Sequence, residues 1–143
     1  SRRQRQMCIR DRKDCVLSKA NQVIIPASGE TKIDIATASC VLVDNVILGG
    51  DINILTSNEN GIFLANYLNF SKRMEISQLA QGISVIHLYA KQLANLSIKL
   101  PCVKEQDKIA KFLRVLDNKI ESLALQLELT KTWKKGLLQK MFV

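Results

Sequence analysis

The sequence has few of the residues from which metal and catalytic sites are built. Its 143 residues include one histidine and two prolines, and its four cysteines form no CxxC pair. A zinc site needs closely spaced cysteine and histidine ligands, so this composition argues against one. Widely spaced cysteines without a framework are typical of reduced thiols in a cytoplasm. We therefore expect no cofactor, no metal and no disulfides.

Long apolar runs and nucleotide-binding motifs are also absent from the sequence. No run approaches the ~18–20 apolar residues of a membrane span, and the early arginines are followed by no apolar signal segment. The motif GxxxxGK[ST] of a translocase does not occur. Pro26 and Pro101 are isolated, whereas the amide-binding segment of a methyltransferase has adjacent prolines, and the acidic residues are too scattered for a nuclease. These absences predict a soluble cytoplasmic protein, with no membrane segment, that is not an enzyme.

The net charge of +8 is concentrated at the two ends of the chain. Residues 1–12 carry five arginines and one aspartate, and residues 104–143 carry nine basic and five acidic groups. Between them, residues 13–103 carry seven basic and seven acidic groups, so the middle of the chain is neutral. Charge alone therefore does not predict nucleic-acid binding.

The first residues of the chain differ in kind from the rest. Residues 2–11, RRQRQMCIRD, have no hydrophobic periodicity, and they resemble the frame translation of a transposase-based sequencing adapter. A basic arm that binds nucleic acid is the alternative interpretation. Because the match is more specific than a short run of charge, we predict that residues 1–12 are an adapter artefact. An upstream part of the natural protein is then expected to be missing.

The middle of the chain mixes short strand and helix patterns. Short β-branched or alternating runs predict strands at residues 23–27, 46–48, 52–55, 84–89 and 97–100. Helical spacing of apolar residues predicts helices at residues 62–70, 73–80 and 91–96, while residues 33–43 fit either element. We expect glycine turns at residues 28–30 and 49–51, and a helix closed by Gly82. The expected fold class is α+β, a small mixed domain followed by one long C-terminal coiled-coil helix.

From Lys104 onward the sequence predicts that long helix. Apolar residues recur at alternating spacings of four and three, and this a/d seam consists of Ile109, Leu113, Leu116, Ile120, Leu123 and Leu127. A helix over residues 104–140 would be roughly 55 Å long. We expect the seam to pair with a partner helix, and a helix packed on its own domain is the alternative. Gly136 costs ~1 kcal/mol within good helix formers, which predicts fraying or a close contact there.

Several segments, taken in order, resemble the specificity subunits of type I restriction–modification systems. The similar segments are residues 26–31 (PASGET), 48–54 (LGGDINI), 80–89 (AQGISVIHLY), 98–101 (IKLP) and 105–142. The first four are similar to a target-recognition domain, and the last is similar to the distal spacer helix of that family. Each motif is short, and the specificity of the resemblance lies in their order and spacing from about Val23 to the last residue.

The resemblance implies a subunit that recognises DNA and has no catalytic site. A complete subunit of this family has two target-recognition domains, which each read half of a split double-stranded DNA site and are each followed by a long helix. The two helices pack antiparallel as a spacer, methyltransferase subunits dock on the assembly, and a translocase–endonuclease subunit joins them. This chain departs from that pattern because it holds one partial recognition domain, residues 13–103, and one helix, residues 104–143. The partner helix would come from the missing half or from a second copy of a half-length subunit.

Two polar segments and one basic pair are the candidates for DNA contact. Side chains that reach base edges or phosphates are Ser28, Glu30, Thr31, Lys32, Lys72, Arg73, Gln81, Ser84, His87 and Tyr89. The alternative is that they form turns, satisfy buried backbone groups or solvate a helix end. Catalysis by His87 with Ser84 is disfavoured, because no orienting acid lies nearby in sequence. The rival function is a non-catalytic adaptor, whose neutral domain binds protein and whose helix oligomerises.

Overall fold

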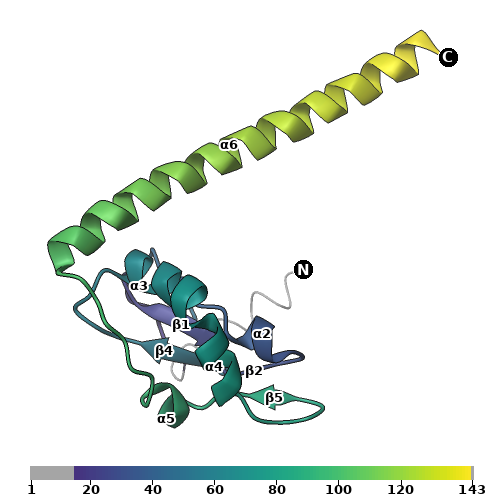
Figure 1. Ribbon diagram of the computed structural model, residues 1–143. Helices are drawn as coiled ribbons and strands as arrows, with labels where there is room; N and C mark the ends of the chain where they lie inside the picture. The colour runs from purple at the N-terminus through teal and green to yellow at the C-terminus, as the bar shows by residue number, and fades with distance from the viewer. Residues whose placement is uncertain (1–14, 143) are drawn as a thin grey trace. The chain divides into compact units, whose positions relative to one another are not determined.

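The computed structural model describes residues 15–142 and has two units, an α+β domain that ends at Gln106 and a helical unit from Asp107 onward. Short strands and helices precede one long helix, which confirms the fold class expected from the sequence (Figure 1). The adapter-like residues 1–12 lie outside the described residues, so their assignment stays a prediction.

A three-stranded antiparallel sheet lies at the centre of the domain. The middle strand β1 (Val23–Pro26) pairs with β3 (Ser39–Cys40) on one side and with β4 (Ile52–Leu55) on the other. Val23 and Ile25 are buried while Ile24 and Pro26 are half-buried, as expected for a β-branched strand that packs one face on a core.

The pairing expected for residues 46–48 is wrong. They do not form a hairpin with β4 across the glycine pair, because Ile47 bridges Leu17 in an antiparallel register instead. The buried hydroxyl of Ser18 fixes this pairing, since it donates to the carbonyl of Val43 and accepts from the N–H of Val46. A long-range partner therefore replaces the local turn.

Two other strand expectations also need correction. Residues 97–100 have no regular structure, and of residues 84–89 only Ile86–His87 form a strand. Leu96 and Leu100 are half-buried and pack against the core. Residues 97–99 are exposed, so the alternation of polar and apolar residue types that predicted an edge strand does not correspond to alternating burial. The ambiguous segment 33–43 contains both elements, a short helix followed by β3.

The helix α3 (Gly61–Tyr67) begins at a well-defined cap. The side chain of Asn60 accepts from the N–H of Phe63 at 3.0 Å. A Cβ at position 61 would collide with the backbone carbonyl of Asn21, whose side chain accepts from the Gly61 N–H at 2.7 Å. The start of α3 therefore requires glycine.

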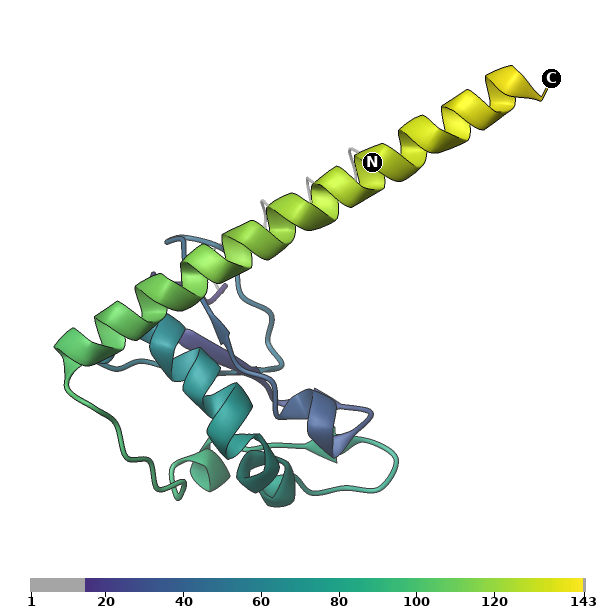
Figure 2. The ribbon, with the colours of Figure 1, turned by 45° about the horizontal axis from the view of Figure 1, so that its top comes forward.

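A π-helical turn joins α3 to the next helix. This turn, η2 (Leu68–Lys72), leads directly into α4 (Arg73–Leu79), and Figure 2 shows the three segments in succession. The sequence predicts both helices but not the turn between them. Asn69 anchors it, because its side-chain amide bonds both the N–H and the carbonyl of Ala38 at 2.7 and 2.8 Å.

One hydrophobic core joins the sheet to the helices. It contains buried side chains from β1, from α2 (Lys32–Ile35), from α3 and α4, and from the segment after β5 (Ile86–His87). The largest fully buried apolar members are Val23, Ile25, Ile35, Ile76 and Leu88. The core thus fixes the strands and helices from which the candidate DNA-contacting residues project.

The long helix α6 (Val103–Met141) agrees with the predicted helix of residues 104–140. It continues through Gly136, where an added Cβ would meet nothing within 4 Å. The fraying expected at this glycine is therefore absent, and no described residue of this chain makes the expected close contact. None of the helices within residues 15–142 is long and apolar enough to cross a membrane.

Candidate nucleic-acid interface

The two polar segments singled out in the sequence lie side by side. β2 (Ser28–Gly29) pairs antiparallel with β5, which places Ser28 opposite His87 and Gly29 opposite Ile86 (Figure 1). Residues 28–29 were expected to form a turn, but they are a strand, and the chain bends after them at Glu30. This two-stranded ribbon, β2 with β5, is the feature that sequence patterns did not predict.

The start of α4 lies next to the same region. α2 packs against both strands of the ribbon and against α4. Arg73 donates from Nε and Nη2 to the carbonyl of Ile33 at 3.4 and 3.3 Å. Lys72 instead forms an ion pair with Glu75 at 2.7 Å. Of the two basic candidates, Arg73 is thus the one that lies beside the polar segments and forms no ion pair within the described residues.

Two of the candidate hydroxyl groups have partners inside the domain. The Ser28 hydroxyl donates to a carboxylate oxygen of Asp51, which ties the ribbon to the start of β4. Thr31 is the N-cap of α2, and its hydroxyl accepts from the N–H of Asp34 at 3.1 Å. The hydroxyls of Ser28 and Thr31 therefore have structural roles within the domain, which was the alternative to DNA contact.

His87 and Tyr89 stack with parallel rings. Their ring centroids lie 6.0 Å apart with an interplanar angle of 17°. His87 also exchanges two backbone hydrogen bonds with Gln81, which hold it at the start of a hydrogen-bonded pairing with that residue. Tyr89 is exposed and starts α5 (Ala90–Leu93), since its N–H donates to Gln92 Oε1 at 2.9 Å.

The side chains of the remaining candidates are exposed and have no hydrogen-bond or ion-pair partner within the described residues. They are Glu30, Lys32, Gln81 and Ser84. An acid, a base, an amide and a hydroxyl on adjacent segments supply both hydrogen-bond donors and acceptors. Such groups can recognise base edges or bind phosphate. The part of the chain that the structure describes contains no group of three His, Cys, Asp or Glu side chains that could hold a metal ion.

Gly82 does not close α4, in contrast to the expectation from the sequence. The helix ends at Leu79, and Ala80 is already extended, with φ −72° and ψ 137°. Gly82 lies further along, with φ 127°, inside the loop that the Gln81–His87 bridge closes. The positive φ therefore serves a loop between the helix and β5 rather than a helix cap.

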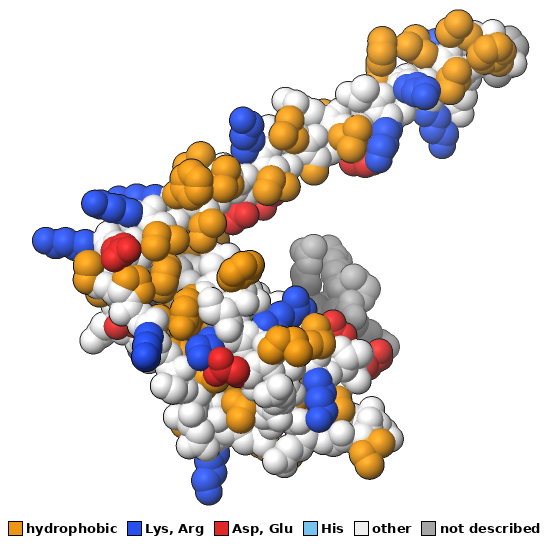
Figure 3. Space-filling model, viewed as in Figure 1, with side chains coloured by type: hydrophobic (Ala, Val, Ile, Leu, Met, Phe, Trp, Pro, Cys, Tyr) orange, Lys and Arg blue, Asp and Glu red, His pale blue; other side chains and the backbone are white. Residues whose placement is uncertain are grey.

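The seam on α6 is largely exposed. Ile120, Leu123 and Leu127 are 64%, 54% and 55% exposed, Leu116 and Ile109 are exposed as well, and Leu113 is half-buried. Figure 3 shows apolar side chains along the length of this helix. Exposed apolar surface of this extent is typical of an interaction site.

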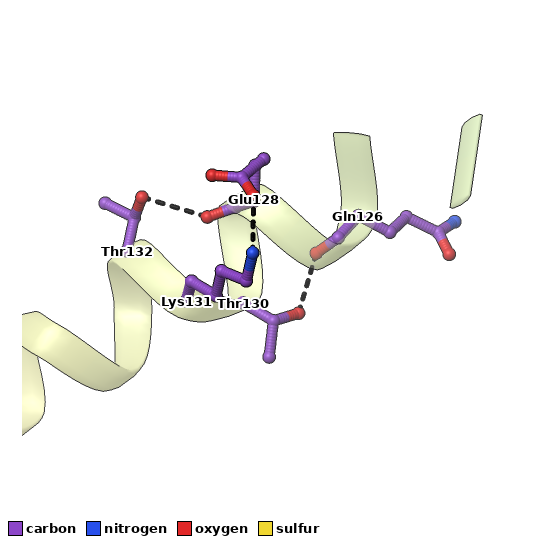
Figure 4. A network of polar contacts seen from close by, with 5 residues as sticks. All are labelled: Gln126, Glu128, Thr130, Lys131 and Thr132. Atoms are coloured by element: carbon purple, nitrogen blue, oxygen red, sulfur yellow. Dashed lines mark hydrogen bonds and ion pairs between the residues drawn. The ribbon is translucent and has the colours of Figure 1, made fainter. Parts of the chain in front are cut away.

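The seam continues toward the C-terminus through a threonine. Thr130 donates its hydroxyl to the carbonyl of Gln126 at 2.8 Å, and Thr132 donates to that of Glu128 at 2.9 Å (Figure 4). Lys131 forms an ion pair with Glu128 at 2.8 Å. Because the Thr130 hydroxyl is bonded within its own helix, this seam position can present a methyl group to a partner helix.

Comparison with known proteins identifies the family. Residues 9–131 match the family described as the type I restriction modification DNA specificity domain. The chain belongs to this family. The match includes the ribbon, both polar segments and the whole seam from Ile109 to Leu127. The resemblance read from the motifs is thereby confirmed.

Two relatives of this specificity-domain family come from Methanocaldococcus jannaschii. The type I restriction enzyme MjaVIII specificity subunit is 35% identical over 79 residues, which cover 53% of this chain and 19% of that protein. A candidate specificity subunit of the MjaX type I restriction enzyme is 31% identical over 99 residues, which cover 66% of this chain and 23% of that protein. The chain spans about a fifth of the length of these curated relatives.

Proposed function

We propose that this chain reads one half of a bipartite double-stranded DNA site, as part of a type I specificity subunit, and carries out no chemistry itself. The observation that supports this most strongly is the ribbon. Its pairing gathers Glu30, Lys32 and Gln81 on adjacent exposed segments, in a member of a DNA specificity family. Glutamine suits adenine, glutamate accepts from cytosine, and lysine binds guanine or phosphate.

The exposed seam supports a helical spacer. Burial of a leucine or isoleucine side chain contributes roughly 1.5–3 kcal/mol, so the exposed seam residues supply enough free energy to hold a second helix. We propose that this helix is the spacer helix of the other half of the subunit, or of a second copy of a half-length subunit. Antiparallel pairing would then fix the distance between the two half-sites.

A second apolar face on α6 supports docking of methyltransferase subunits. Val115, Leu125, Leu129 and Trp133 are 64%, 63%, 62% and 68% exposed. At about 100° per residue they lie on the side of the helix away from the seam, so a helix paired through the seam still presents them. We propose that methyltransferase subunits cover this second face, and that the translocase–endonuclease subunit joins through them.

The experiment that tests DNA reading uses the complete specificity subunit co-expressed with its methyltransferase subunits. Long-read sequencing of the host genome maps the methylated adenines and hence the bipartite site. Gln81→Ala and Lys32→Ala should change or relax one half-site and leave the other half-site intact. Lys99→Ala, in the connection before α6, is the matched control and should leave both unchanged. If neither variant alters the methylated sites, the ribbon does not read DNA.

The adaptor is the second candidate function, favoured by the neutral domain and by the two exposed apolar faces of α6. The two functions differ in their salt dependence. DNA binding releases counterions and weakens steeply as salt rises, whereas pairing through leucine and isoleucine does not. A complex that captures duplex DNA at low salt and releases it with a steep slope supports DNA reading, and salt-independent protein capture without DNA binding supports the adaptor.

A further inference from the structure

The loop before β5 is closed tightly at its base. Gln81 and His87 exchange backbone hydrogen bonds of 2.9 and 2.7 Å, so that residues 82–86 leave and re-enter the fold at one point. Gly82 has φ 127°, and a Cβ there would collide with the carbonyl oxygen of Val85. Side chains flanking the loop anchor it in the core, since Ala80, Ile86 and Leu88 are 1%, 5% and 0% exposed. The backbone hydrogen bonds, the glycine and the buried anchors therefore fix the conformation of the loop.

This loop presents one apolar side chain almost completely to solvent. Ile83 is 98% exposed. No residue from 81 to 86 is charged, and the exposed polar neighbours Gln81 and Ser84 flank Ile83. Ile83 contributes nothing to the core, and even together with Val85, which is 52% exposed in the same loop, it offers far less surface than the ~800 Å² per partner of a stable protein interface. A partner that makes a small apolar contact among polar contacts fits these features better, and a base-pair edge in DNA is such a partner.

The dimensions of the ribbon indicate which groove it would enter. With its side chains a two-stranded ribbon is about 10 Å thick, as the spacing of packed sheets indicates, so it fits the major groove, which is ~12 Å wide, but not the minor groove, which is ~6 Å wide. The apolar group that base pairs present in the major groove is the 5-methyl of thymine. The loop before β5 extends away from the paired strands (Figures 1 and 2), which leaves its residues free to reach the groove floor.

We infer that Ile83 is a specificity-determining residue that contacts the 5-methyl group of a thymine in the major groove of the half-site. This inference rests on the proposed function, because it requires the ribbon to read DNA. Gln81 and Ser84 then lie beside Ile83 to hydrogen-bond neighbouring base edges. Ile83 selects thymine through a methyl group, and the amide and hydroxyl select their bases through donors and acceptors.

The test uses the complete subunit assembled with its methyltransferase subunits and a duplex that carries the mapped site. Each thymine of the half-site is replaced in turn by deoxyuridine, which removes only the 5-methyl group. For the wild-type complex, one replacement should weaken binding about fourfold, the factor for burying one methyl-sized group. Ile83→Ala should bind the thymine and deoxyuridine duplexes equally at that position, and Ile83→Val should keep the discrimination. Circular dichroism should be unchanged for both variants, because Ile83 lies outside the core.

Different outcomes overturn the inference and the proposed function. If the complex is sequence-selective but Ile83→Ala still distinguishes thymine from deoxyuridine as the wild type does, the Ile83 assignment is wrong and DNA reading stands. If Ile83→Ala lowers the affinity for all duplexes equally, the assignment is also overturned, because Ile83 then makes a contact that does not depend on the thymine methyl group. A wild-type complex with no sequence preference overturns both.

Discussion

Replacement of Gln106 should weaken the domain more than any other single polar change near the start of α6. Gln106 is fully buried, and its side chain makes three hydrogen bonds. Its Oε1 accepts from the N–H of Asn60 at 3.0 Å, and its Nε2 donates to the carbonyl of Pro101 at 2.9 Å and to a carboxylate oxygen of Glu59. One amide therefore joins the first turn of α6 to the cap of α3.

The expected cost of Gln106→Ala follows from these contacts. A buried polar group that loses its partner costs about 1–3 kcal/mol. Glu59 and Asn60 are only half-buried, so water compensates them in part. We expect a total loss of about 3 kcal/mol, which corresponds to about a hundredfold faster exchange of the amides in α3. Hydrogen exchange followed by mass spectrometry of residues 61–67 measures this change.

Two further variants test the reasoning. Gln126→Ala changes the same residue type at an exposed position of the same helix, and its effect should stay within about 0.5 kcal/mol. Gln106→Glu preserves the shape but places a second carboxylate against Glu59, so it should destabilise the domain at about pH 7 and recover in part at about pH 4. Unchanged exchange in Gln106→Ala would refute the proposed linkage between α3 and α6.

The other predictions concern the seam, the core and Gly136. Leu123→Asp places a charge on the seam and should abolish assembly with the partner helix, as measured by size-exclusion chromatography. If the circular dichroism signal shows that the α+β domain unfolds as well, the spacer assignment is contradicted. Ile76→Ala empties a fully buried site and should lower the unfolding free energy by about 2–5 kcal/mol in urea titration, and a change under about 1 kcal/mol would place Ile76 outside the core. Gly136→Ala should stabilise α6 by about 1 kcal/mol in thermal melting; weaker assembly instead would show that a partner packs there.

Sequence patterns predicted the helices well because each helix depends on neighbours along the chain. The apolar spacing of α6 and of α4 is local, and both helices lie within a residue or two of the predicted bounds. Strand pairing is not local, and it was predicted poorly. The run at Val46 and Ile47 looked like half of a hairpin, but its actual partner, near Leu17, precedes it by some thirty residues. The π-helical turn at η2 depends on a contact between Asn69 and Ala38, which no periodicity encodes.

The candidate interface shows the same division. Both polar segments were identified from residue types, but their adjacency depends on the pairing of Ser28 with His87, which are far apart in sequence. Residue type also did not separate side chains with structural roles from exposed ones. Thr31 and Lys32 are both exposed, but the Thr31 hydroxyl caps a helix, whereas the Lys32 side chain has no such role in the described residues. Ile83 was missed, because the candidates for DNA contact were selected for polar or charged groups that reach base edges or phosphates.

The loop before β5 has a base that the core holds in place and exposed side chains that can be substituted. Ile86 and Leu88 are buried in the core and alternate with exposed or half-buried positions, while Ile83 and Ser84 project from the loop without core contacts. A change at either exposed position should therefore alter what the loop binds at little cost in folding free energy, typically within about 0.5 kcal/mol. A change at Gly82 should alter the loop backbone itself, because a Cβ there collides with the Val85 carbonyl. Under the proposed function, DNA specificity would accordingly change one side chain at a time, provided that the glycine and the buried anchors are kept.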